Sequence, residues 1–408
     1  MVVTPSLDAS QSTGGHLAEQ VSGLWAWLKE KVDPALYRPQ ARPGTTISHL
    51  TGRDGDYYIL KNPVDTTYCR LSDRDHFLWE RMDGGRTVKD LVVAYFLEYG
   101  SFAFARVALL VQGLKAGSFL SERPVNVYQH VRSGLEAHRP GQRLARLFQF
   151  FLQSRYALQG IDRFVGAVYR WFGRPLFTKP FQLLWLAISA AGLYAFAWAV
   201  NVGEYGIVTI AGSVQLGVIG LLLANLCAIF LHEMAHALTV KHYGRQVNRG
   251  GFMIYFGLPA FFVDTTDIWL EGKRARLAVS WAGPYSGLIL GGLASISVLL
   301  WPDLALNPLL FQFAFLAYLS VFLNLNPLLE MDGYYLLMDW LEIPMLRRRS
   351  LEFVRTGLWQ KLRSLEDRRL AKILAAFSRQ QRIFAAFGLL SAIWGAYAIL
   401  LGIYFWEQ

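Results

Sequence analysis

Five apolar stretches, each long enough to cross a lipid bilayer as a helix, constrain this chain most. They fall at about residues 181–200, 214–240, 277–300, 309–330 and 383–406. A bilayer core is spanned by roughly 20 consecutive apolar residues. The composition agrees, because 53% of the 408 residues are hydrophobic and 17% are charged, whereas soluble domains carry about 25% charged residues. We therefore expect a mainly α protein, a polytopic bundle of about five membrane-spanning helices.

The charge of the connections alternates along this part of the chain. Segments 201–213 and 301–308 contain no Lys or Arg, whereas segments 163–179, 241–276 and 345–382 are rich in both. Short loops rich in Lys and Arg stay on the cytoplasmic side of the membrane. The pattern predicts a multi-pass protein of the cytoplasmic membrane with its amino terminus in the cytoplasm. The same pattern accounts for the net charge of +10, so no nucleic-acid partner is needed to explain that charge.

One further apolar stretch, residues 250–263 (GGFMIYFGLPAFFV), is too short to span a bilayer. We interpret it as a re-entrant or hairpin segment. Such a segment is tolerated only where protein or trapped water satisfies its backbone groups.

The first 180 residues divide by composition into three parts. Residues 1–44 read as a tail with a short amphipathic helix at 24–28. Residues 45–125 read as a small soluble domain, and residues 126–180 are basic and amphipathic. The last part is typical of a helix on a membrane surface, although a solvated linker helix packed on the soluble domain fits as well. Residues 181–408 form the membrane domain.

The soluble domain is predicted to be α+β. Strands are expected at 57–60 and 66–71, followed by helices capped by Ser72 and Thr87 and a third helix from Phe102. Two strands followed by three short helices suggest a winged-helix type of unit. On this pattern alone, a plain small α+β domain is equally compatible.

The motif His232-Glu233-Met234-Ala235-His236 lies at the end of the second apolar stretch. On a helix, residues four apart share a face, so both imidazoles can bind one zinc ion. Glu233 lies beside them and can take a proton from a water held by the metal. Three ionisable residues in a membrane span are costly and indicate function. The alternative, boundary residues that extend toward water, explains neither the spacing nor the glutamate.

A zinc site needs a third ligand, and an acidic segment follows the fourth apolar stretch. Asp332 stands just past that stretch and before the flexible Gly333, with Glu330 nearby. The predicted topology ends the second and fourth spans on the same side of the membrane. The histidine pair and Asp332 are therefore expected at similar depth.

These motifs together resemble the site-2 protease family of intramembrane zinc metalloproteases. The resemblance rests on HEMAH in a membrane helix and on FLNLNPLLEMDG about a hundred residues later. It implies zinc as cofactor, Asp332 as the third ligand, Asn324 as a residue that holds the substrate backbone, and Pro327 as a helix-breaking proline. The sequence departs from the family at 328–331, where prolines are common.

Longer segments resemble a bacterial branch described as peptide zinc metalloproteases. They read GFMIYFGLPAFFVDTTDIW, RARLAVSWAGPYSGLILGG and NPLLEMDGYYLLMDWLEIPMLRRRSLEF. In that branch a PqqD-like domain, a winged-helix peptide-binding module, often precedes the membrane enzyme. Residues 45–125 resemble that module through YCRLSDRDHFLWERMDGGRTVKDL. The resemblance implies that this domain captures a substrate or leader peptide.

Three smaller features complete the sequence predictions. The glycines Gly283, Gly287, Gly291 and Gly292 have the small-residue spacing of closely packed membrane helices. Asp264, Asp267 and His242 read as turn or boundary residues rather than as metal ligands. Cys69 and Cys227 support neither a disulfide framework nor a cysteine zinc site.

Together these observations predict an intramembrane zinc metalloendopeptidase that cleaves a membrane-associated peptide or protein. The alternative is a non-proteolytic zinc-binding accessory for peptide capture, maturation or export, but a structural zinc site has no need of Glu233 and usually has four protein ligands. The expected partners are the bilayer, a peptide or membrane-protein substrate, and an export or secretion system as a further candidate. DNA binding is disfavoured, because residues 72–100 lack the basic surface that it requires.

Overall fold

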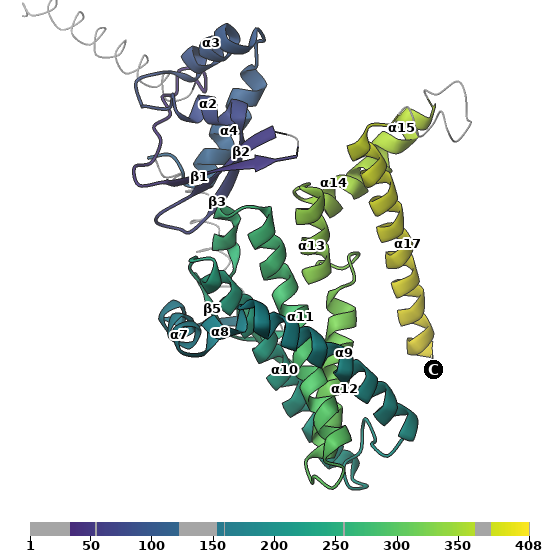
Figure 1. The fold of residues 1–408 in the computed structure, drawn as a ribbon. Helices are drawn as coiled ribbons and strands as arrows, with labels where there is room; N and C mark the ends of the chain where they lie inside the picture. Colours follow the sequence, from purple (N-terminus) through teal and green to yellow (C-terminus); the bar gives the residue numbers. More distant parts are fainter. Residues whose placement is uncertain are drawn as a thin grey trace, which may run out of the picture. The chain divides into compact units, whose positions relative to one another are not determined.

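The computed structural model describes residues 33–53, 55–121, 153–158, 160–255, 258–363 and 377–407. The chain forms two compact units, Met1–Arg139 and Pro140–Gln408, which Figure 1 colours from purple to yellow along the sequence. Among the residues described, the second unit contains five helices long and apolar enough to cross a membrane. The predicted fold class, a polytopic helix bundle with a small α+β domain, is confirmed. The short helix predicted at 24–28 lies outside the described residues.

The first unit contains an antiparallel sheet of order β1-β2-β3. Its strands are β1 (Thr46–Gly52), β2 (Gly55–Lys61) and β3 (Tyr68–Ser72). The prediction of two strands was therefore incomplete, because β1 was missed. None of the residues of β1 (TISHLTG) is fully buried. The strand therefore lacks the alternation of apolar and polar residues by which a half-buried strand is recognised in a sequence. Pairing with β2, such as Ile47 opposite Leu60, establishes it.

Three helices follow the sheet, as predicted. They are α2 (Asp73–Trp79), α3 (Val88–Tyr99) and α4 (Phe104–Ala116). Ser72 and Thr87 cap the first two through reciprocal bonds with Asp75 and Asp90, an arrangement that satisfies two free N–H groups at each helix start. The apolar faces of helices and sheet enclose one core, which includes Leu60, Leu71, Leu78, Leu91, Val107 and Leu114.

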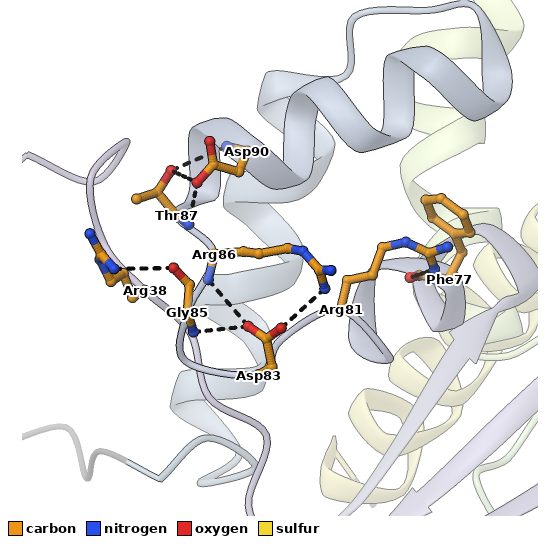
Figure 2. A network of polar contacts seen from close by, with 8 residues as sticks. All are labelled: Arg38, Phe77, Arg81, Asp83, Gly85, Arg86, Thr87 and Asp90. Carbon is orange, nitrogen blue, oxygen red and sulfur yellow. Dashed lines mark hydrogen bonds and ion pairs between the residues drawn. The ribbon is translucent and has the colours of Figure 1, made fainter.

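Figure 2 shows how the turn before α3 is built. Asp83 accepts hydrogen bonds from the backbone N–H groups of Gly85 and Arg86, and the Arg86 guanidinium pairs with it at 3.1 Å. The two backbone N–H groups and the guanidinium hold the pKa of the Asp83 carboxyl below its usual range. Thr87 then begins the helix with its hydroxyl on Asp90 at 2.7 Å. The turn and the cap together set the direction in which α3 leaves the sheet.

The second unit contains the five membrane-length helices. They are α9 (Lys179–Val202), α10 (Val214–His242), α11 (Lys273–Leu300), α12 (Asn307–Asn324) and α17 (Arg379–Glu407). The fourth span was predicted to reach residue 330, and this end was wrong. Proline disfavours helical backbone in the residue before it, and Pro327 follows Asn326 directly, so α12 ends three residues before the proline.

Helix α11 packs against α9, α10 and α12 (Figure 1). Gly292 lies against the backbone of Ile188 on α9, and Gly287 and Gly291 lie against Ala317 and its neighbours on α12. Small residues let membrane helices approach closely, so the predicted packing role of these three glycines is confirmed. Gly283 behaves differently and is described with the site.

A second antiparallel sheet accompanies the helices, with order β4-β5-β6. Its strands are β4 (Gln153–Ala157), β5 (Gly250–Tyr255) and β6 (Leu258–Val263). The hairpin alternative for residues 250–263 is confirmed. Strand β4 corrects the prediction of a surface helix there, because its residues pair with β5, Arg155 opposite Met253. The predicted linker otherwise contains α7 (Ile161–Val168), η1 (Tyr169–Gly173) and α8 (Arg174–Leu176), while its residues 126–152 lie outside the described part.

Short helices complete the second unit. They are η2 (Thr266–Leu270), α13 (Asp332–Leu341), α14 (Leu346–Glu352), η3 (Phe353–Gly357) and α15 (Leu358–Arg363). Tyr334, Ile343 and Leu346 form a buried cluster with Phe384 and Phe387 of α17. This cluster anchors the segment that carries Asp332.

Candidate metal centre

Helix α10 presents two imidazoles to one point. The Nε2 atoms of His232 and His236 are 3.1 Å apart, since residues four apart on a helix share a face. His236 is 7% exposed, and the side chain of His232 is 15% exposed. Both rings are therefore held within protein.

The backbone of α11 orients the second imidazole. His236 Nδ1 lies 2.7 Å from the carbonyl oxygen of Val279. A carbonyl can only accept, so Nδ1 carries the proton and Nε2 keeps its lone pair. Metal-binding histidines are commonly fixed in this way through the nitrogen that does not bind the metal.

The third member of the cluster comes from the segment after α12. Asp332 Oδ2 lies 3.0 Å from His232 Nε2, and Asp332 Oδ1 lies 3.4 Å from His236 Nε2. Asp332 is the first residue of α13. The next residue is Gly333, at which a side chain would overlap the backbone of Leu325. The glycine thus allows the start of α13 to approach the end of α12.

The pKa of Asp332 favours metal binding. Burial by itself raises the pKa of this carboxyl, but its close contacts with the imidazoles of His232 and His236 outweigh burial and hold the pKa well below its usual range. The carboxylate is therefore ionised at neutral pH, which is the form that binds metal.

Of the two acidic candidates, Asp332 is the one that joins the histidines. Glu330 lies 3.8 Å from Arg347, and its side chain is 59% exposed. Asn324, predicted to hold substrate backbone, is the last residue of α12 and donates its amide to Ser320 Oγ at 3.0 Å. That contact directs the amide nitrogen of Asn324 toward its own helix.

Gly283 on α11 is the site residue that the sequence analysis missed. A Cβ at this position would overlap the Nε2 atoms of both His232 and His236. The absence of a side chain leaves the space in front of the two lone pairs clear. The spacing of the glycines predicts only a helix-packing role for Gly283, because nothing in the local sequence shows which neighbour this residue faces.

His232, His236 and Asp332 converge closely enough to share one metal ion, because one ligand atom from each lies within 4.8 Å of the others. Bonds of about 2.0–2.1 Å at tetrahedral angles place ligand atoms roughly 3.3–3.4 Å apart. The two Nε2 atoms are 3.1 Å apart, and each lies 3.0 or 3.4 Å from a different oxygen of the Asp332 carboxylate. Two imidazoles and one carboxylate form a ligand set of the kind found in catalytic zinc sites, which leave the fourth position for water or substrate. His232, His236 and Asp332 therefore fit zinc.

Glu233 lies next to this cluster on the same helix. Its carboxylate bonds to the backbone of Val263 at the end of β6, and it also lines a cavity between α7, α10 and β6. Glu233 therefore lies beside the metal ligands along α10 and also forms part of the wall of a recess.

Two salt bridges connect the start of α11 with the end of α13. Arg276 Nε lies 2.9 Å from Asp339 Oδ1, with side chains 9% and 14% exposed. Lys273 Nζ lies 2.9 Å from Glu342 Oε1. Since α13 carries Asp332 and α11 carries Gly283, these pairs hold the two halves of the centre together.

The remaining polar candidates lie outside the cluster and have structural partners. Asp264 accepts from the Thr266 backbone at 3.0 Å, and Asp267 from the Gln246 backbone at 2.9 Å. His242 bonds to the Tyr169 hydroxyl and stacks on Phe177. These contacts agree with turn and boundary roles.

Comparison with known proteins gives partial similarity. The chain is 28% identical over 118 residues to a Bacillus subtilis protein named "Putative peptide zinc metalloprotease protein YydH", a match covering 28% of this chain and 45% of the relative. It is 37% identical over 71 residues to an uncharacterized protein of Methanocaldococcus jannaschii, covering 17% of this chain and 20% of the relative. The matches thus span less than half of either relative. No family model and no solved structure matches.

Proposed function

We propose that this protein is an intramembrane zinc metalloendopeptidase of the site-2 protease type, which hydrolyses a peptide bond in a membrane-associated protein or peptide. One observation carries the proposal: His232, His236 and Asp332 converge, with one ligand atom from each within 4.8 Å of the others, and Glu233 lies beside them. The partial similarity to a protein named as a peptide zinc metalloprotease supports it.

The chemistry follows from the side chains. Zinc, when bound, lowers the pKa of water and polarises a substrate carbonyl. Glu233 accepts a proton from the attacking water and delivers it to the leaving amine, so one carboxylate serves as general base and then as general acid. Asp332 and the two imidazoles hold the metal. His236 keeps its orientation through its bond to Val279, and Asn324 is the candidate for holding the substrate backbone.

The substrate reaches this centre as an extended chain. A helix hides its carbonyls in internal hydrogen bonds, so a transmembrane substrate has to unwind before attack. Strand β6 lies at one edge of the described sheet. Asp264 donates to Arg249 across the hairpin, and neighbouring residues of an antiparallel strand alternate in direction. The backbone groups of Phe261 and Val263 therefore point away from β5. The Val263 N–H is taken by Glu233, so the Phe261 N–H and the carbonyl groups of both residues are the ones that can pair with a substrate strand.

The first unit serves as a PqqD-like module that captures a substrate or leader peptide. In the described part of its sheet, β3 occupies an edge. A shallow recess near the end of that strand is lined by Ser72, Asp73, Arg74, Tyr99 and Arg106. An edge strand beside a recess with charges of both signs suits an extended polar peptide.

The charge distribution supports the placement of the enzyme in a bacterial cytoplasmic membrane with the first unit in the cytoplasm. The basic connections lie on the side at which α10 and α12 end, and basic loops remain cytoplasmic. An export or secretion system is then a natural partner for the cleaved peptide.

The decisive experiment compares the purified protein with Glu233→Gln, His236→Ala and Asp332→Ala variants. We expect about one zinc per wild-type chain by elemental analysis, near-normal zinc in Glu233→Gln, and loss of zinc in the other two. Transmembrane peptides presented in proteoliposomes should be cleaved by the wild type only, as read by mass spectrometry. Cleavage by Glu233→Gln would refute the mechanism. Zinc retained without any cleavage would favour the non-proteolytic accessory.

A further inference from the structure

A cavity of about 340 Å³ opens beside Glu233. Its walls come from α7, the end of β4, β6 and α10, and they include Leu158, Ile161, Phe164, Phe230, Phe261 and Val263. Among the described lining residues, Glu233 alone carries a charge. Binding pockets in proteins begin at roughly 300 Å³, so the cavity is large enough for one bulky side chain.

The cavity communicates with the surroundings. Leu158, Phe164 and Phe230 are 60%, 52% and 38% exposed, although each contributes to its wall. Well-packed interiors contain few voids larger than a water molecule. A recess of this size, lined by exposed aromatic and aliphatic side chains, is therefore a binding surface rather than a packing defect.

The cavity and the metal centre share one residue and one strand. Glu233 lines the cavity and lies beside the His–Asp cluster, while Val263 lines the cavity and bonds to Glu233. A substrate strand along β6 would place its reacting carbonyl near Glu233. Because alternate residues of a strand point to opposite faces, one residue flanking that carbonyl points into the cavity.

We propose that this cavity is a specificity pocket that accepts a large apolar side chain, of leucine or phenylalanine size, from a residue flanking the cleaved bond. The inference rests on the proposed function and names the class of residue at the cleavage site. An anionic side chain is rejected, because the described walls carry the charge of Glu233 and offer no cation to pair with it, and burial of an unpaired charge is costly.

The test uses zinc-loaded full-length protein in detergent and peptide hydroxamates, which bind zinc directly and carry one variable side chain beside the chelating group. Displacement of a fluorescent hydroxamate reports affinity without requiring turnover. We expect the leucine and phenylalanine compounds to bind at least tenfold more tightly than the alanine compound, and the aspartate compound to bind more weakly still.

Two matched variants assign this preference to the cavity. Phe164→Ala removes a wall side chain that is half-exposed, and Phe172→Ala removes a phenylalanine of η1, 73% exposed, that does not line the cavity. The leucine-to-alanine affinity ratio should fall at least threefold in Phe164→Ala and stay unchanged in Phe172→Ala. Zinc content is measured in both variants to show that they are folded.

The outcomes separate this inference from the proposed function. Equal affinity for the leucine and alanine compounds, or an unchanged ratio in Phe164→Ala, would overturn the pocket while leaving the metal centre intact. Failure of zinc-loaded protein to bind even acetohydroxamic acid would contradict an open zinc site, and the pocket would fall with the proposed function.

Discussion

Substitution of Gly283 by Ala tests the geometry of the metal centre most directly. The change adds one methyl group, which would overlap the Nε2 atoms of His232 and His236. In an ordinary helix the same change is mildly stabilising, by up to about 1 kcal/mol, because alanine has the higher helix propensity. A loss of zinc binding would therefore reflect the contact with the imidazoles and not a weaker helix.

The magnitude follows from the space available. The imidazole nitrogens and the new methyl group would have to separate by roughly 1 Å to reach ordinary van der Waals contact, whereas zinc–ligand distances vary by about 0.2 Å. His236 cannot retreat freely, because the carbonyl of Val279, which lies on α11 together with Gly283, holds its Nδ1 atom. Changes to outer partners of metal ligands already cost about 10–100-fold in affinity, so we expect Gly283→Ala to weaken zinc binding at least 100-fold.

The assay is a zinc competition titration against a chromogenic chelator, on protein purified in detergent. Gly287→Ala is the control, one turn further along α11. A methyl group there meets the tip of Val321 at 2.7 Å and a backbone oxygen of Ala317 at 3.4 Å, both on α12 and neither in the metal centre. We expect its zinc affinity to stay within threefold of wild type, even if its melting temperature changes.

Two results would refute the reasoning. Wild-type zinc affinity in Gly283→Ala would mean that the imidazoles do not converge in front of this glycine. Equal loss of zinc in Gly283→Ala and Gly287→Ala would mean that general packing of α11, and not the contact at position 283, controls the site.

Other predictions follow from buried groups near and away from the centre. Asp339→Asn removes a charged partner of the buried Arg276 and should weaken zinc binding about 10–100-fold. Asp162→Asn is the control, because it removes the half-exposed partner of Lys241. Zinc affinity in this control should stay unchanged in the same titration. Burial raises the pKa of the Cys69 thiol to about 11, with a smaller contribution from Asp75. At pH 8 the thiolate fraction of Cys69 is then lower than that of an ordinary cysteine by a factor on the order of 100. Labelling by iodoacetamide, followed by mass spectrometry, should therefore be slow until the pH approaches 11.

Much of the membrane unit was predictable, because its signals are local. The apolar stretches locate all five helices to within a few residues at most ends, and the clear error, the end of the fourth, came from an apolar run that continues past Asn324. The histidine pair was equally local, since residues four apart on one helix must share a face.

Features that depend on distant pairing were not predictable. Strand β4 owes its existence to β5, about a hundred residues later, and its own residues carry no distinctive alternation. Strand β1 is likewise an edge strand, and in the described sheet it pairs with β2. Extended segments without an apolar pattern adopt strand geometry only where a partner accepts their hydrogen bonds.

The sequence by itself determined which residue types were available: a pair of histidines on one membrane helix with a glutamate beside them, and two carboxylates after the fourth span. Only the tertiary structure decided that Asp332 rather than Glu330 meets the histidines, that Gly283 clears the space before them, and that a recess opens beside Glu233. The physical reason is that spacing along one helix is set by backbone geometry, whereas contacts between helices depend on how their surfaces pack.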